Sequence, residues 1–100
     1  MLLLDATTKS VEAVLEAAPA ANQPSFMLGG VDYSSGALTP YSNDGALSGV
    51  TPVTLAAAPG SGVRREMRSL IINNRDTAAV NLLIRLNNNS TIRKIGRFTL

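Results

Sequence analysis

The segment from Val80 to Leu86 alternates apolar and polar positions, and it is the clearest structural signal in the chain. Its apolar side chains recur at every second position: Val80, Leu82, Ile84 and Leu86. Successive side chains of an extended strand point to opposite faces, so this spacing predicts a strand with one buried face. The runs 64–73 and 91–100 are also β-rich, and asparagine-rich turns separate them from it. The pattern predicts a three-stranded antiparallel meander over residues 60–100.

Residues 7–18 fit two patterns at once. Apolar residues spaced three and four apart would form one face of a helix that Pro19 ends. The alternation of Val11, Ala13 and Leu15 with polar residues fits a strand instead. The alanines favour the helix, but β-rich surroundings can override intrinsic propensity. We favour the strand, and the helix stays open as the alternative.

The remainder of the first half contains further strand signals and a long polar stretch. Residues 25–33 have the pattern of a strand interrupted by Gly29 and Gly30, where a β-bulge or a close backbone approach is expected. Residues 34–51 are rich in glycine and carry few large apolar side chains, which predicts a long loop. Residues 53–58 have the pattern of a short strand.

These elements predict one all-β domain over residues 1–100. A chain of 100 residues is long enough for a single modest core. We expect a small antiparallel β-sandwich or jelly-roll-like domain. In this arrangement residues 1–24 would form an extended N-terminal arm followed by the first strand or a short helix.

The chain contains no cysteine and no histidine. It therefore lacks the residues that provide thiolate catalysis, disulfides, the common zinc sites and the usual general base near neutral pH. Asp32, Asp44 and Asp76 do not have the spacing of a calcium loop, and turn formation explains Asp44 and Asp76 more simply. We expect no enzymatic activity, no cofactor and no metal site.

The N-terminus begins with an apolar run, Leu2, Leu3 and Leu4, that ends at Asp5. No basic region precedes this run, so it does not have the form of a secretory signal. Every apolar run in the chain is also shorter than the roughly 18 residues of a membrane-spanning helix. We expect a protein made in the cytoplasm without a membrane partner, in which this run docks on a neighbouring subunit as an apolar arm.

Charge is divided unevenly along the chain, although the net charge is only +2. Residues 1–59 hold one basic and five acidic residues, a net charge of −4. Residues 60–100 hold eight basic and two acidic residues, a net charge of +6. Because the two halves carry opposite charge, we expect them to permit head-to-tail or ring-like packing of identical copies.

The basic cluster at residues 63–68 could suggest nucleic-acid binding. Four aromatic residues occur in the chain, and none lies among these arginines as a base-stacking platform would require. We therefore expect no nucleic-acid partner, and expect the basic side chains to meet acidic surfaces of neighbouring subunits. The candidate interaction residues are Arg64, Arg65, Arg68, Arg93 and Arg97.

Several segments resemble a group of small structural proteins of tailed bacteriophages. They are residues 4–12, 53–59, 63–80 and 84–89. The resemblance implies a non-enzymatic component of the virion that contacts copies of itself and capsid, tail or connector proteins. A fibre or tail-associated piece and a head-decoration protein fit it equally, with a head-to-tail joining protein as a further option. Members of that group continue beyond the equivalent of residues 97–100, so the resemblance also implies a final hairpin that is missing or supplied by a neighbour.

A binding module is the alternative from another functional class. In that interpretation Tyr33, Tyr41 or the loop between them would recognise a carbohydrate or another ligand on the host surface. Saccharide sites usually offer several aromatic platforms, and this chain has few aromatic residues. We therefore favour the structural role.

Overall fold

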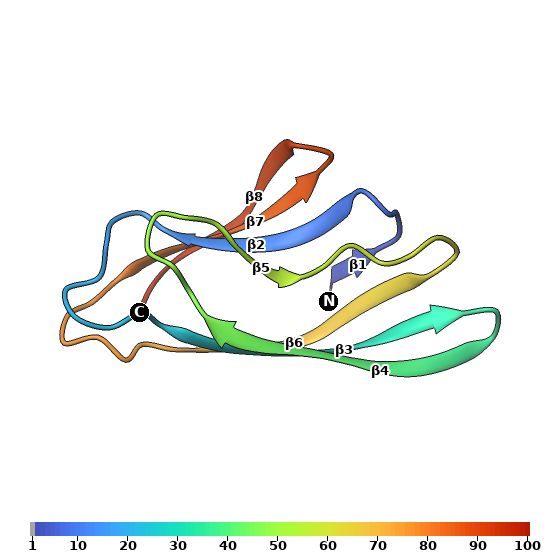
Figure 1. Cartoon of the computed structure of the whole chain (residues 1–100), viewed down its shortest axis with the longest axis horizontal. Coiled ribbons are helices and arrows are strands. Elements are labelled where there is room, and N and C mark those ends of the chain that lie inside the picture. The colour runs from blue at the N-terminus through green and yellow to red at the C-terminus, as the bar shows by residue number, and fades with distance from the viewer. Residues whose placement is uncertain (1) are drawn as a thin grey trace.

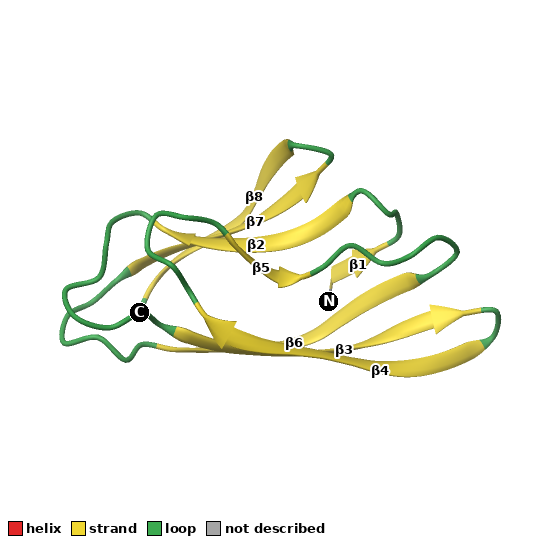
Figure 2. Ribbon diagram, in the orientation of Figure 1, coloured by secondary structure: helices red, strands yellow, loops and turns green. Residues whose placement is uncertain are grey.

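Alternating apolar positions produce eight antiparallel strands in the computed structural model, which describes residues 2–100 (Figure 1). The described part of the chain consists of strands joined by loops and turns (Figure 2). The strands are β1 (Leu2–Leu4), β2 (Lys9–Leu15), β3 (Ser25–Ser34), β4 (Ala37–Ala46), β5 (Val53–Ala56), β6 (Arg64–Asn73), β7 (Asn81–Asn88) and β8 (Thr91–Thr99). The first sheet has the order β1-β6-β3-β4 and the second the order β5-β2-β7-β8. The predicted all-β, sandwich-like domain is confirmed.

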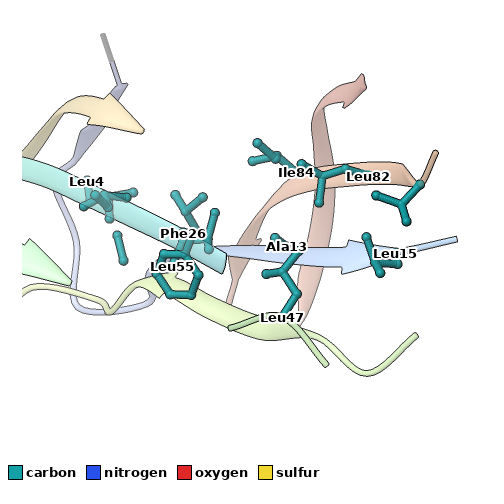
Figure 3. Close-up of a cluster of buried hydrophobic side chains, with 12 residues drawn as sticks. Leu4, Ala13, Leu15, Phe26, Leu47, Leu55, Leu82 and Ile84 are labelled. Atoms are coloured by element: carbon teal, nitrogen blue, oxygen red, sulfur yellow. The ribbon is translucent and has the colours of Figure 1, made fainter. Parts of the chain in front are cut away.

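The core lies between the two sheets. Figure 3 shows side chains of both sheets meeting there, among them Phe26 of the first sheet and Leu55 of the second. Twelve buried apolar residues form this core: Leu4, Val11, Ala13, Leu15, Phe26, Leu28, Leu47, Leu55, Ala56, Val80, Leu82 and Ile84. Burial of one large apolar side chain contributes roughly 1.5–3 kcal/mol, so this cluster is the main source of stability.

The ambiguous segment 7–18 contains the strand β2. Val11, Ala13 and Leu15 are buried, while the residues between them are only half-buried. β2 pairs with β5 on one side and β7 on the other, which makes it a central strand of the second sheet. Tertiary pairing therefore overrides the helix propensity of the alanines, and the favoured strand interpretation is confirmed.

The glycine pair in β3 produces both features that were predicted for it. The register between β3 and β6 shifts between Gly29 and Gly30, which leaves Arg68 as the extra residue of a β-bulge. A Cβ atom on Gly30 would lie 2.2 Å from the carbonyl oxygen of Glu66. Only glycine fits at this position, because the two backbones approach too closely for any side chain.

The three-stranded meander predicted for residues 60–100 is wrong. β6 lies in the first sheet between β1 and β3, whereas β7 and β8 pair with each other in the second sheet. The connection 74–80 therefore crosses from one sheet to the other. The β7–β8 hairpin itself is present, with Asn89 and Ser90 at φ values of 50° and 71°, the positive values that a tight two-residue turn requires.

The long loop predicted for residues 34–51 is also wrong. β3 extends to Ser34, and a two-residue turn with positive φ at Ser35 and Gly36 leads directly into β4. β4 is an edge strand, which tolerates Pro40 because an edge strand donates hydrogen bonds on one side only. The segment lacks large apolar residues because most of β4 is exposed, so the hydrophobic pattern that marks other strands is absent.

The predicted N-terminal arm is a strand of the chain's own first sheet. Leu2, Leu3 and Leu4 form β1, which pairs antiparallel with β6. Leu4 is fully buried in the core of the same molecule, and Leu2 packs against that core. Leu3 faces away and is exposed. The expectation of an arm docking on a neighbour is thus corrected for Leu4, because its side chain already has partners within the chain.

Candidate functional site

Ion pairs connect the acidic and basic halves of the chain within one molecule. Three of the five ion pairs among the described residues join a carboxylate from residues 1–59 to a base from residues 60–100. These pairs are Arg65 with Asp32 (2.8 Å), Arg85 with Glu12 (2.9 Å) and Arg97 with Glu16 (2.6 Å). Three of the five carboxylates of the first half are therefore paired within the molecule, which leaves less acidic charge for head-to-tail packing of copies.

Arg65 has a structural role in this fold. Its side chain is only 12% exposed, and its Nε and Nη2 atoms donate to the two carboxylate oxygens of Asp32 at 2.8 and 3.0 Å. The bond to Asp32 raises the pKa of Arg65, although burial opposes this shift. Nη1 donates to the Ala57 carbonyl at 2.6 Å, and the guanidinium lies 3.6 Å from the centre of the Tyr41 ring. Arg65 thus fastens the end of β5 to the first sheet.

Arg68 belongs to a smaller network around Glu66. The Arg68 Nε donates to Glu66 at 2.5 Å, and the Tyr33 hydroxyl donates to the same carboxylate at 3.0 Å. These two bonds, that of Arg68 first, lower the pKa of the largely buried Glu66. Arg68 itself remains 56% exposed. It can therefore contact a partner, but its charge is already paired.

The tyrosines proposed for ligand recognition have partners within the chain. Tyr33 donates to Glu66, and Tyr41 lies beneath Arg65 with its hydroxyl accepting a bond from the Ala57 amide at 3.3 Å. The segment between them is the β3–β4 hairpin and not an open loop. Both rings are half-buried, so this region lacks the exposed aromatic platform of a saccharide site.

The remaining predicted basic residues lie on the surface. Arg64 begins β6 and Arg93 lies on β8, and both are exposed. Neither forms an ion pair among the described residues, and the same holds for Lys94 next to Arg93. Arg97 is exposed as well but pairs with Glu16. The structure therefore places two unpaired cations at consecutive positions of β8, with Arg93 on the face of Leu86 and Lys94 on the opposite face with Arg85.

An apolar groove lies between the two sheets where β6 faces β7 and β8. It consists of two adjoining cavities of about 330 and 310 Å³ that share Leu70, Ile84 and Phe98. β1 has only three residues, so the part of β6 beyond Met67 has no strand on its outer side. Figure 2 shows the β7–β8 hairpin bending away from β2 toward its turn. The groove is thus open along the margin formed by β1 and β8, where β1 covers only part of β6 and no strand follows β8.

β8 carries three large exposed apolar side chains, of which Ile95 and Phe98 lie at this groove and Ile92 lies on the opposite face of the strand. Ile92 is 42% exposed, and Ile95 and Phe98 are each 48% exposed. Ile95 is the extra residue of a bulge against β7, and both Ile95 and Phe98 line the groove. The Phe98 ring lies over Gly96, where a Cβ atom would come within 2.8 Å of it. One sequence signal could have indicated this site, because the apolar residues Ile92, Ile95 and Phe98 break the alternation of a half-buried strand.

Asp76 has a role that turn chemistry alone does not describe. Its carboxylate accepts bonds from the backbone amides of Ala20, Ala21 and Asn22 at 2.8–3.1 Å, and from the amide of Thr77 at 2.9 Å. Asp76 therefore ties the β6–β7 connection to the β2–β3 connection, which both cross between the sheets. Sequence reasoning missed this role because the two loops are more than 50 residues apart.

Three comparisons bear on the identity of the site. The chain matches no protein-family model, no curated protein and no solved structure. Within residues 2–100, no three His, Cys, Asp or Glu side chains are grouped so that they could hold a metal ion. The same residues include no helix long and apolar enough to cross a membrane. The geometry of the groove and of β8 is therefore the basis for assigning a function.

Proposed function

We propose that this protein is a non-enzymatic structural component of a tailed-bacteriophage virion, synthesised in the host cytoplasm and incorporated into the particle. It acts by packing and strand pairing against neighbouring subunits, as a fibre or tail-associated protein or as a head-decoration protein. A head-to-tail joining protein is a further structural option. Its partners are copies of itself and other virion proteins of the capsid, tail or connector.

The observation that carries the proposal is the open margin formed by β8 and the adjoining groove. β8 has nine residues and no strand on its outer side, so it presents unpaired backbone donors and acceptors. Its exposed isoleucines and Phe98 add an apolar surface next to them. In a free monomer these backbone groups stay unpaired and the apolar surface stays exposed. In an assembly, a partner strand can pair with the backbone groups and bury the apolar surface.

The resemblance of residues 4–12, 53–59, 63–80 and 84–89 to phage structural proteins supports the same role. The accessible members of the predicted interaction surface are Leu3, Arg64, Arg68, Arg93 and Arg97. Arg65 and Leu4 are excluded from it, because both have partners inside the fold. The proposed contact surface is thus smaller than the sequence predicted and lies partly along β8.

Mass spectrometry of purified particles tests this function directly. Particles of a phage whose genome encodes this chain would be banded by density and analysed for the protein. We expect the protein at a constant ratio to the major capsid protein across the particle band. A phage enzyme known to be absent from particles serves as the control in the same lysate. Finding the protein only in the soluble fraction with that enzyme would contradict the proposal.

A further inference from the structure

We propose that the groove between the sheets receives an acidic, extended segment of a different polypeptide. This segment adds to β8 as a further strand and places alternate apolar side chains in the groove. The inference rests on the proposed function, since it names the class of partner that strand pairing in an assembly requires. The partner is defined by its chemistry: a β-strand that alternates apolar and acidic residues.

The backbone of β8 favours a strand as the occupant. β7 pairs with one side of β8 along its whole length, and the other side has no strand. The opposite long edge of the molecule, β4, contains Pro40, which cannot donate a hydrogen bond. β8 contains no proline, so none of the backbone donors on its free side is missing.

The side chains next to β8 favour an apolar face on that strand. Seven residues line the larger cavity with apolar side chains: Leu2, Val11, Met67, Leu70, Ile84, Ile95 and Phe98. Side chains alternate between the two faces of a strand, so every second side chain of an added strand would point toward this surface. The same arrangement leaves the intervening side chains of the added strand pointing outward into solvent.

Charge favours acidic residues at the outward positions. Arg93 and Lys94 are exposed and have no carboxylate partner among residues 2–100. Opposite charges on neighbouring strands attract each other, and like charges directly opposite one another are unfavourable. Lys94 lies opposite Arg85 on the outer face of the sheet, whereas Arg93 lies opposite Leu86 on the groove face. A strand with glutamate or aspartate at the outward position beside Lys94 would therefore pair with β8 in preference to a neutral or basic one.

The same charges disfavour a second copy of this chain as the occupant. Pairing β8 with β8 across a two-fold axis would bring together two strands that carry only basic charged residues. The chain's own acids offer little compensation, because five of its seven acidic residues form ion pairs. Asp76 accepts four backbone amides, which leaves Asp44. The acidic strand therefore comes from another polypeptide.

Binding of synthetic peptides to the purified protein tests the inference. The first probe is a fluorescein-labelled peptide of the length of β8 in which glutamate alternates with valine. The second replaces every glutamate by lysine, and the third has the composition of the first but groups the glutamates at one end. Fluorescence anisotropy should show saturable binding of the first peptide only. Amide chemical shifts should change along β8 and the facing part of β6, and not along β4.

Matched variants locate the site. Ile95→Asp should abolish binding of the alternating acidic peptide, whereas Leu38→Asp, at a position of β4 that is 66% exposed, should leave it unchanged. Both side chains are exposed, so circular dichroism should show an intact fold for both variants. The double variant Arg93→Glu with Lys94→Glu should switch the preference to the lysine peptide, and Arg75→Glu, an exposed cation in the β6–β7 connection, should not.

Besides a failure of the alternating acidic peptide to bind, three results would overturn the inference. They are equal binding of all three peptides, chemical-shift changes centred on β4, and a stable homodimer in light scattering that Ile95→Asp dissociates. The last would show that a second copy occupies the groove. If no peptide binds but the protein is found in particles, this inference is wrong and the proposed function stands. If the alternating peptide binds but the protein is absent from particles, the proposed function is wrong and the groove still binds a strand.

Discussion

The two margins of this sandwich are closed in different ways. On one margin β4 and β3 face β5, and polar side chains of the first sheet hold β5 in place. Asn43 donates to the Leu55 carbonyl at 2.9 Å, and Arg65 and Tyr41 bond to Ala57. On the other margin β1 is only three residues long, and β8 faces the first sheet across an apolar groove. The molecule therefore has one margin where hydrogen bonds join the two sheets and one where the sheets are separated by an open apolar groove.

This difference separates the residues that maintain the fold from those that are free to bind. The residues that join β5 to the first sheet are buried or bonded within the chain, so changing them should lower stability. Residues of the open margin on β8 are exposed and make few polar contacts, so changing them should affect binding and leave the fold intact.

Leu55→Ala should cause the largest loss of stability. Leu55 is fully buried on β5, and removing a buried leucine side chain costs about 2–5 kcal/mol through lost burial and the cavity left behind. Urea unfolding followed by circular dichroism measures this change. Leu38→Ala is the matched control on an exposed site, and its effect should stay within about 0.5 kcal/mol. Similar losses for both variants would show that β5 is not part of the packed core.

Arg65→Met should cost less, at about 1–3 kcal/mol of unfolding free energy. The substitution keeps much of the side-chain bulk but leaves the Asp32 carboxylate, which is 19% exposed, without its bidentate partner. Arg97→Met is the control, because Arg97 and its partner Glu16 are both exposed and the pair should contribute about 1 kcal/mol or less. The same urea experiment compares the two. A larger loss for Arg97→Met would contradict the structural role assigned to Arg65.

Acid should destabilise the protein through carboxylates that are bonded in the fold. The pKa of Glu66 lies below its ordinary value of 4.5 because of its bonds from Arg68 and Tyr33. Burial raises the pKa of Asp76, but its backbone amide bonds together bring it below the ordinary value of 3.8. A carboxylate with a lowered folded pKa contributes its stability fully above the unfolded pKa. That contribution is lost as the pH falls from the unfolded pKa through the folded one.

The urea midpoint should therefore fall as the pH drops below about 4.5. Asp76→Asn should make this fall shallower, because the variant has no carboxylate to protonate at the loop junction. Glu66→Gln should do the same on the first sheet, and Asp44→Asn, an exposed residue outside the ion pairs, serves as the control. A fall of equal steepness in the parent and in both test variants would exclude these two carboxylates as its cause.

Ile95→Asp should have the smallest effect on stability, within about 0.5 kcal/mol, because its side chain is exposed on the open margin. Urea unfolding measures this effect beside Ile84→Asp, which places a charge on a buried position of β7, the strand paired with β8. The Ile84 variant should be severely destabilised, since an unpaired buried charge is costly. Comparable destabilisation by both substitutions would mean that β8 is part of the closed core.

The hydrophobic pattern predicted strands well wherever one face is buried. Alternation identified β7, and the Gly29-Gly30 pair marked the bulge in β3, because both signals are local. The same pattern did not predict that β6 lies in the other sheet, since alternation specifies which side chains share a face and not which strand is the neighbour. β4 was missed because an exposed edge strand has no apolar face to reveal it.

The candidate site was harder to predict from sequence than the fold. The opposite charges of the two halves were visible, but whether Arg65, Arg85 and Arg97 pair within a molecule or between molecules depends on tertiary structure. The groove arises because a three-residue β1 lies opposite a nine-residue β8. No local sequence property encodes that difference in length. The apolar residues Ile92, Ile95 and Phe98 indicated only that the strand has an exposed apolar surface.

Site-specific photo-crosslinking in cells producing phage particles tests the central claim most directly. The photoreactive residue p-benzoylphenylalanine would replace Ile95 on β8 and, in a matched variant, Leu38 on β4, both exposed positions on long edge strands. Position 95 should crosslink to a different virion protein, and position 38 should not. Crosslinks from position 38 with none from position 95 would contradict the claim that the open margin at β8 is the site of assembly.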